Sequence, residues 1–191
     1  MSNSKNKFEG KHSIVIISTS YAEKKIKKEF YSNFLKEEMA LRKLQNYHFI
    51  PKLLGSDHNF LTIKMEKIEG VNLLTIIKLY RKRKISEDLI LSIFKIIFKI
   101  CFVMDLEKIY KDEWNRPFKH VIFAKESIKI IDFDRSVFNT SKKNTLQFLS
   151  FVFGFWKMFN TRQFFTYLYE FSIFYEKQIE KYQSFFIDSP Y

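Results

Sequence analysis

The chain is poor in the residues that break or cross-link a polypeptide. Its 191 residues include one cysteine, three prolines and four glycines. Such low glycine and proline contents exclude collagen-like, linker-rich and glycine-rich low-complexity proteins. The single cysteine, Cys101, lies in an apolar run and can form neither an internal disulfide nor, alone, a zinc site. We therefore expect Cys101 to be a core residue of a protein in a reducing compartment.

Acidic residues are few relative to basic ones. The chain has 33 lysines and arginines against 21 acidic residues, which gives a formal net charge of +12. Basic residues cluster at Lys24–Lys28 and at Arg81–Lys84, and such clusters attract phosphate groups. An RNA-containing or phosphorylated complex is therefore among the expected partners, although no RNP, KH, zinc-finger or helix-turn-helix signature accompanies the charge. The alternative is a solvated basic surface.

A long unbroken apolar run is also lacking. The first twelve residues contain no apolar segment of the kind found in secretory signals. The longest apolar stretch, Leu89 to Leu106, is interrupted by Lys95 and Lys99, whereas a membrane-spanning helix needs about 20 predominantly apolar residues. We expect a cytoplasmic protein without stable membrane insertion. A membrane-surface role for the aromatic, basic region 148–191 is a further alternative.

The composition supports a folded core, because 46% of the residues are hydrophobic and 18% are aromatic. The length fits a single domain, 1–191, or two small lobes that share a cleft. The pattern predicts an α+β fold, with a β-rich first part that contains one helix and a mostly helical second part that contains a small hairpin. The expected strands are 13–19, 21–30, 59–68 (an edge strand), 121–123 and 127–132, and the expected helices are 32–45, a segment ending near 79, 86–108 and two or three within 145–186.

Two carboxylates stand out from this pattern. Asp132 follows the apolar strand in IKIIDFDRS, where a fixed carboxylate next to a turn could hold a metal ion. Its alternative role is to cap a turn or to pair with a surface arginine. Glu37 lies on the helical stripe formed by Phe34 and Leu41, and a glutamate on a buried face usually has a cationic partner. The adjacent Glu38 is the alternative to Glu37.

The order of these elements resembles the protein-kinase fold. It consists of a strand lysine, a helix glutamate, the connector MEKIEG, a long apolar helix, the polar loop YKDEWNRPFKH and the string IIDFD. It is similar above all to the compact, atypical archaeal serine/threonine protein kinases, relatives of the RIO-type kinases, over about residues 8–150. The string IIDFDR also resembles the lipopolysaccharide core sugar kinases. The resemblance implies a two-lobed fold, with a small β-rich N-lobe over 8–69 and a reduced, mostly helical C-lobe over 70–191.

The resemblance implies roles for the charged residues. Asp132 matches the aspartate that binds Mg²⁺ beside the phosphates of ATP. Glu37 matches the helix glutamate that pairs with the phosphate-holding lysine. For that lysine we favour Lys28, and both Lys24 and Lys27 remain open.

The polar loop departs from the general kinase pattern. Glu113 stands in the place of the catalytic aspartate and is the expected catalytic base. The place of the metal-binding asparagine is taken by Phe118 if the match to the kinase pattern contains no gap. It is taken by His120 if the match is fixed on the strand that follows, and His120 could face metal or phosphate. In the connector, backbone groups of Glu66 and Ile68 are expected to bind adenine.

The phosphate loop departs as well, because Gly10 is the only glycine before Gly55. The resemblance therefore predicts an atypical kinase that uses ATP and Mg²⁺ and transfers the γ-phosphoryl group to a protein serine or threonine, to itself or to water. The alternative is a catalytically degenerate, kinase-like binding protein that acts on a phosphate-rich partner such as RNA. The oligomeric state is not indicated.

Overall fold

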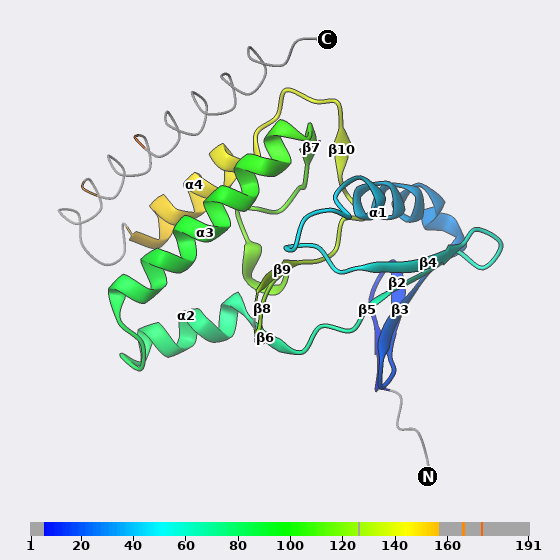
Figure 1. Ribbon diagram of the computed structural model, residues 1–191, viewed down its shortest axis with the longest axis horizontal. Coiled ribbons are helices and arrows are strands. Elements are labelled where there is room, and N and C mark those ends of the chain that lie inside the picture. The colour runs from blue at the N-terminus through cyan, green and yellow to red at the C-terminus, as the bar shows by residue number, and fades with distance from the viewer. Residues whose placement is uncertain (1–5, 126, 157–165, 167–172, 174–191) are drawn as a thin grey trace. The chain divides into compact units, whose positions relative to one another are not determined.

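The computed structural model describes residues 6–125 and 127–156, together with 166 and 173 (Figure 1). The chain divides into two compact units, Met1–Phe148 and Leu149–Tyr191. Within the first unit, strands and helices come in groups along the chain, as in an α+β protein. The helices predicted beyond residue 156 lie outside the described ranges, and the assignment of 8–69 and 70–191 to two lobes stays a prediction.

The first part of the chain forms a five-stranded antiparallel sheet. The predicted hairpin is confirmed, since the second and third strands pair from Ser13 opposite Ile26 to Ile17 opposite Ala22. Its second strand ends at Ile26, earlier than predicted, because Lys28–Phe30 form a 3₁₀ turn. The strands lie in the order β1 (Asn6–Glu9), β2 (Ser13–Ile17), β3 (Tyr21–Ile26), β5 (Thr62–Glu66) and β4 (Leu53–Asp57).

The prediction that residues 59–68 form an edge strand is wrong. β5 pairs with β3 on one side and with β4 on the other, so it lies inside the sheet. β4 has the sequence LLGSD, which contains Gly55 and no alternation of apolar and polar residues. It therefore carries no strand signal of its own and forms because β5 offers it a partner.

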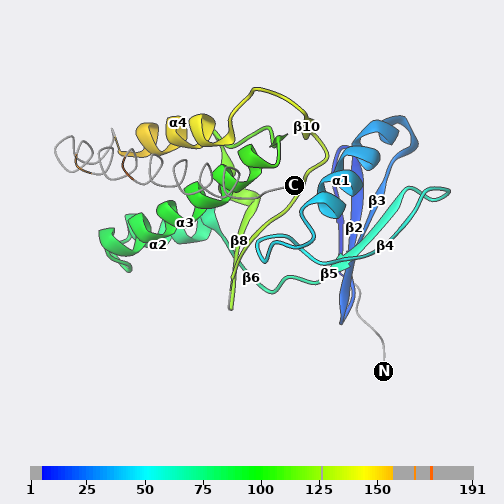
Figure 2. The same ribbon diagram turned by 45° about the horizontal axis from the view of Figure 1, so that its top comes forward.

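The helix α1 (Tyr31–Lys43) packs along one face of this sheet (Figure 2). Its buried stripe includes Phe34 and Leu41, and Leu44 follows directly after its end. On the sheet, Ile26 and Ile63 are also almost fully buried. These side chains form a small apolar core that fixes α1 against β3 and β5, the strands that carry the site described below.

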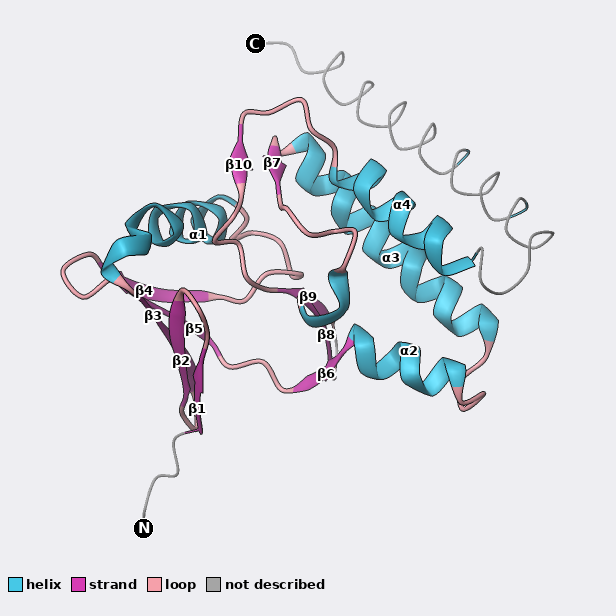
Figure 3. Ribbon diagram, turned by 180° about the vertical axis from the view of Figure 1, so that it is seen from behind, coloured by secondary structure: helices cyan, strands magenta, loops and turns pink. Residues whose placement is uncertain are grey.

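The next part of the first unit combines helices with short strands (Figure 3). Two helices, α2 (Leu73–Arg81) and α3 (Glu87–Leu106), contact each other, and Ser86 caps α3 by accepting a hydrogen bond from the Leu89 amide at 3.2 Å. A three-stranded sheet has the order β6 (Gly70–Asn72), β8 (Val121–Ala124) and β9 (Ile128–Ile130). A Cβ atom on Gly70 would lie 2.2 Å from the carbonyl oxygen of Phe123, so the close pairing of β6 with β8 requires glycine.

A buried aspartate links the end of α3 to the start of α4 (Asn144–Trp156). Asp105 accepts hydrogen bonds from the amide and Nδ2 of Asn144 at 2.6 and 2.7 Å, and from the amide and Oγ1 of Thr145 at 3.2 and 2.7 Å. Asn144 Oδ1 in turn accepts from the Lys111 amide at 2.8 Å. Lys111 follows β7 (Ile109–Tyr110), which pairs with β10 (Val137–Phe138). The network thus fixes the start of the polar loop.

The described part of the chain is therefore a mixed α+β structure with several antiparallel sheets and four α-helices, in agreement with the predicted class. None of these helices combines the length and the apolar character needed to cross a membrane.

Candidate functional site

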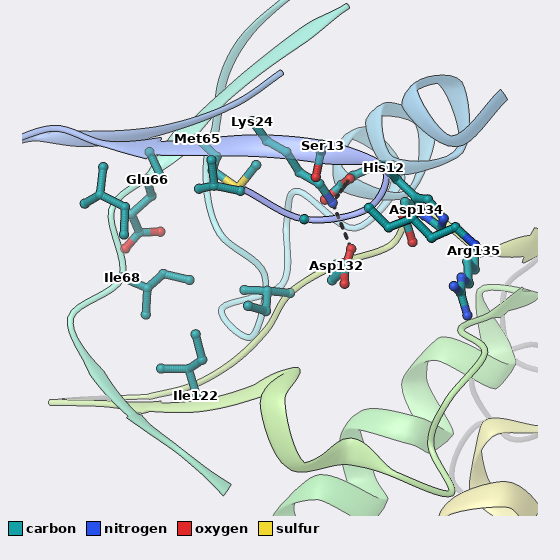
Figure 4. Close-up of a pocket in the computed structure, with 17 residues that line it drawn as sticks. His12, Ser13, Lys24, Met65, Glu66, Ile68, Ile122, Asp132, Asp134 and Arg135 are labelled. Atoms are coloured by element: carbon teal, nitrogen blue, oxygen red, sulfur yellow. Dashed lines mark hydrogen bonds and ion pairs between the residues drawn. The ribbon is translucent and has the colours of Figure 1, made fainter. Parts of the chain in front are cut away.

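A cavity of about 410 Å³ lies between the five-stranded sheet and the segment that follows β9. Its lining is divided by character, with apolar side chains at one end and charged side chains at the other (Figure 4). The apolar end has Val15, Ile17, Ala22, Met65, Ile68, Ile122 and Ile131, with the carboxylate of Glu66 beside them, and the charged end has Lys11, Lys24, Glu37, Asp132, Asp134 and Arg135. An apolar cavity with a few convergent charges is typical of a small-molecule site.

Lys24 on β3 lies at the centre of the charged end. Its Nζ atom is 2.5 Å from Glu37 Oε2 and 2.8 Å from Asp132 Oδ1. The three residues come from β3, from α1 and from the segment after β9, so the fold brings together groups that are far apart in the sequence. The predicted pairing of Glu37 with a lysine of the 24–28 segment is confirmed.

The choice of Lys28 for this pairing is wrong. Ala22, Lys24 and Ile26 share one face of β3, but the strand ends at Ile26 and Lys28 begins the 3₁₀ turn. Lys28 is exposed and makes no ion pair with the described residues. The third candidate, Lys27, pairs with Glu9 of β1 at 3.7 Å.

Glu37 and its neighbour Glu38 face different surroundings. Glu37 is only 2% exposed and faces Lys24. Glu38 Oε1 accepts from Arg42 at 2.8 Å and from Ser56 of β4 at 2.5 Å. Glu37 is thus the glutamate directed at the cavity, and Glu38 fastens the flank of α1 to the sheet.

Lys24 and Asp132 are charged at neutral pH, whereas burial raises the pKa of Glu37 despite the nearby Lys24. Burial disfavours the charge on Lys24, but the carboxylates of Glu37 and Asp132 outweigh it and raise the Lys24 pKa above its ordinary value. Burial likewise acts to raise the pKa of Asp132, yet the nearby charges of Lys24 and Lys111 lower it to about 2. Asp132 therefore presents a carboxylate, one oxygen of which is held by Lys24.

A second lysine, which the sequence did not single out, holds the backbone of Asp132. Asp132 has a φ of 68°, a conformation that residues other than glycine rarely adopt. Lys111 Nζ donates a hydrogen bond to the Asp132 carbonyl oxygen at 2.5 Å, and burial lowers the Lys111 pKa. Lysines are seldom buried, so sequence alone gives no reason to place Lys111 here.

Of the two candidate residues of the polar loop, His120 lies beside Asp132, and Glu113 lies beside His120. His120 Nε2 is 3.5 Å from Asp132 Oδ2, and His120 Nδ1 is 3.5 Å from Glu113 Oε2. Glu113 Oε1 also accepts a hydrogen bond from Arg135 Nη1 at 2.9 Å. Burial and the charge of Lys111 lower the pKa of His120 to about 4, so its imidazole is neutral at pH 7. Phe118 is the other candidate for the asparagine position, and none of Glu113, Phe118 and His120 lines the cavity itself.

The turn between β1 and β2 covers the charged end. Its residues Gly10, Lys11, His12 and Ser13 line the cavity, and the Gly10 amide donates to the Ser13 carbonyl at 2.8 Å. His12 Nδ1 is 3.5 Å from Asp134 Oδ2, and Asn33 Nδ2 donates to the same oxygen at 3.3 Å. The turn therefore contacts Asp134 through His12 at the charged end.

Glu66 and Ile68 line the opposite, apolar part of the cavity. The Glu66 amide already donates to the Lys52 carbonyl at 2.8 Å, and the Glu66 carboxylate accepts from Lys129 at 3.1 Å. Of its backbone groups, Glu66 can therefore offer only the carbonyl oxygen to a ligand.

The charged end has one carboxylate suited to a nucleotide-bound metal. Within the described ranges, no three His, Cys, Asp or Glu side chains gather closely enough to enclose a metal ion. Mg²⁺ is usually held by one or two carboxylates together with substrate phosphates and water. Asp132 fits this requirement because it is ionised and directed into the cavity. The imidazole of His120 suits Mg²⁺ less well, since Mg²⁺ prefers oxygen ligands.

Comparison with known proteins adds no further assignment. No protein-family model matches the chain, and no curated protein matches it. Any function must therefore be argued from the pocket itself.

Proposed function

We propose that the protein is an atypical, ATP-dependent kinase with a kinase-like two-lobed fold. The observation that carries the proposal is the contact of buried Lys24 with both Glu37 and Asp132 at one end of an apolar cavity. Burying charges is unfavourable unless they are paired, and perturbed charged clusters in cavities are concentrated at functional sites. The N-lobe is assigned to 8–69 and the C-lobe to 70–191.

The division of the cavity suits a nucleotide. The apolar end accommodates the base, whose edge is bound by the Glu66 carbonyl and by the backbone of Ile68. At the other end, the Lys24 ammonium binds phosphate oxygens, and the Asp132 carboxylate holds Mg²⁺. A bound Mg²⁺ neutralises negative charge on the phosphates.

Glu113 is assigned as the base. It accepts the proton of an acceptor hydroxyl while the hydroxyl oxygen forms a bond to the γ-phosphorus and the bond to the ADP oxygen breaks. Neutral His120 lies 3.5 Å from Glu113 and from Asp132, and its one ring N–H can orient one of these carboxylates. The acceptor is a serine or threonine of a protein substrate or of the chain itself, or water.

One observation favours a second candidate function. The Glu113 carboxylate is engaged by Arg135, and neither Phe118 nor His120 supplies the side-chain amide of the usual asparagine. A protein with these features could bind ATP without transferring phosphate and act as a kinase-like binding protein on a phosphate-rich partner such as RNA.

Turnover of ATP labelled at the γ-phosphate distinguishes the two candidates. Glu113→Gln is expected to lower turnover by about 10² to 10⁴, the usual contribution of a positioned base. Asp112→Asn is the matched control, because Asp112 is an exposed neighbour of Glu113, whereas Glu113 contacts His120 and Arg135, and this substitution should leave turnover unchanged. ATP binding without turnover in the parent protein, or equal turnover in the parent and Glu113→Gln, would assign the chain to the second candidate.

A further inference from the structure

Arg135 has a fixed backbone and an exposed side chain at the edge of the cavity. The Ser136 amide donates to the Phe133 carbonyl at 3.0 Å, which closes a turn around Arg135, and both Phe133 and Ser136 are fully buried. The Arg135 side chain is nevertheless 50% exposed and lines the charged end of the cavity (Figure 4). Its guanidinium can therefore change partners without any rearrangement of the backbone.

The charged end is short of cations for a triphosphate. Three carboxylates, those of Glu37, Asp132 and Asp134, line it, while the buried Lys24 is already held by two of them. The turn Gly10–Ser13 contains one glycine, so it offers less of the close amide contact that glycine-rich loops give to phosphates. Even with Mg²⁺ held by Asp132, a further side-chain cation would favour the binding of a triphosphate here.

Two exposed cations of the described residues line this end, Lys11 and Arg135. Arg135 differs from Lys11 because its Nη1 atom also donates to Glu113 Oε1 at 2.9 Å. A guanidinium binds carboxylates and phosphates with the same planar pair of donors, whereas an ammonium acts as a point charge. Arg135 thus lies within reach of two anions, the Glu113 carboxylate and the phosphates of a bound nucleotide.

We propose that Arg135 moves from Glu113 to the terminal phosphate of bound ATP, so that it recognises the γ-phosphate and releases the Glu113 carboxylate at the same time. The inference rests on the proposed function. While Glu113 Oε1 accepts from Arg135, the guanidinium occupies one acceptor site of the carboxylate and holds the side chain beside Arg135. With ADP in the cavity, Arg135 keeps Glu113 engaged. The contact thus releases the Glu113 side chain from Arg135 when there is a phosphoryl group to transfer.

The test is a comparison of dissociation constants for ADP and for a non-hydrolysable ATP analogue, each with Mg²⁺, by titration calorimetry. The parent protein should prefer the ATP analogue. Because hydrogen bonds between charged groups are the strong ones, Arg135→Gln should weaken binding of the analogue by about tenfold or more and leave ADP binding unchanged. Arg135→Lys should retain part of the preference. Arg81→Gln, which removes one exposed positive charge at the end of α2, should match the parent.

The outcomes separate this inference from the function on which it rests. A parent protein that binds neither nucleotide overturns the proposed function and the role of Arg135 together. A parent that prefers the ATP analogue, with an equal preference in Arg135→Gln, overturns the role of Arg135 and leaves the proposed function standing. Equal weakening of both nucleotides by Arg135→Gln also overturns it, since the contact is then not with the γ-phosphate.

Discussion

Replacement of Lys24 by methionine tests the charged cluster through stability. Methionine keeps most of the length of the side chain but removes the ammonium group 2.5 Å from Glu37 Oε2. Glu37 is 2% exposed, so its carboxylate would be left buried without a cation, whereas the Asp132 side chain is 36% exposed and can be hydrated. Removal of one partner of a buried ion pair typically destabilises a protein by about 3–5 kcal/mol. We expect Lys24→Met to lower the free energy of unfolding by this amount.

Two further variants isolate the pair. Lys28→Met removes an exposed charge four residues away and should change the free energy of unfolding by about 0.5 kcal/mol or less. The double variant Lys24→Met with Glu37→Leu should recover much of the loss, because a buried ion pair can often be replaced by apolar side chains. Unfolding in urea, followed by circular dichroism, measures all four proteins. Equal effects of Lys24→Met and Lys28→Met would refute the assignment of Lys24 as the buried partner.

Two other predictions concern the residues that position the site. Asp105→Ala leaves the buried donors of Asn144 and Thr145 without their acceptor, so it should destabilise the protein by about 3 kcal/mol. The same urea unfolding measures this loss. A loss of stability near zero would refute the hydrogen-bond network around Asp105. Burial holds the His120 pKa at about 4, below its ordinary 6.5, so the stability that depends on neutral His120 is complete above pH 6.5 and is lost as the pH falls towards 4. The loss amounts to about 3 kcal/mol, and His120→Gln should remove that part of the pH dependence; an unchanged pH profile would contradict the low pKa.

The sequence predicts those features that depend on local periodicity. The hairpin of β2 and β3 and the buried stripe of α1, with Glu37 on it, follow from spacings of two, three and four residues. Lys24 could not be chosen over Lys28 in this way, because residues four positions apart would share one face if the strand continued to residue 28. The choice depends on where β3 ends, and that is set by the 3₁₀ turn at Lys28–Phe30.

Other features depend on contacts between distant segments. β4 is a strand because β5 pairs with it, although its own residues give no strand pattern. Lys111 is buried because the Asp132 carbonyl and the Asn144 side chain hold it, and lysine is otherwise a surface residue. The ion pair of Glu113 with Arg135 joins residues 22 positions apart and has no local signature.

The most direct test of the central claim is the effect of ATP on the melting temperature, measured with and without Mg²⁺ in the parent protein and in Asp132→Asn. A ligand that binds the folded state stabilises it by mass action. We expect ATP to raise the melting temperature of the parent, more so with Mg²⁺, and we expect Asp132→Asn to lose the contribution of Mg²⁺ because it lacks the carboxylate that holds the metal. A parent protein whose melting temperature is unchanged by millimolar ATP and Mg²⁺, or an Asp132→Asn variant that keeps the full Mg²⁺ effect, would contradict the account.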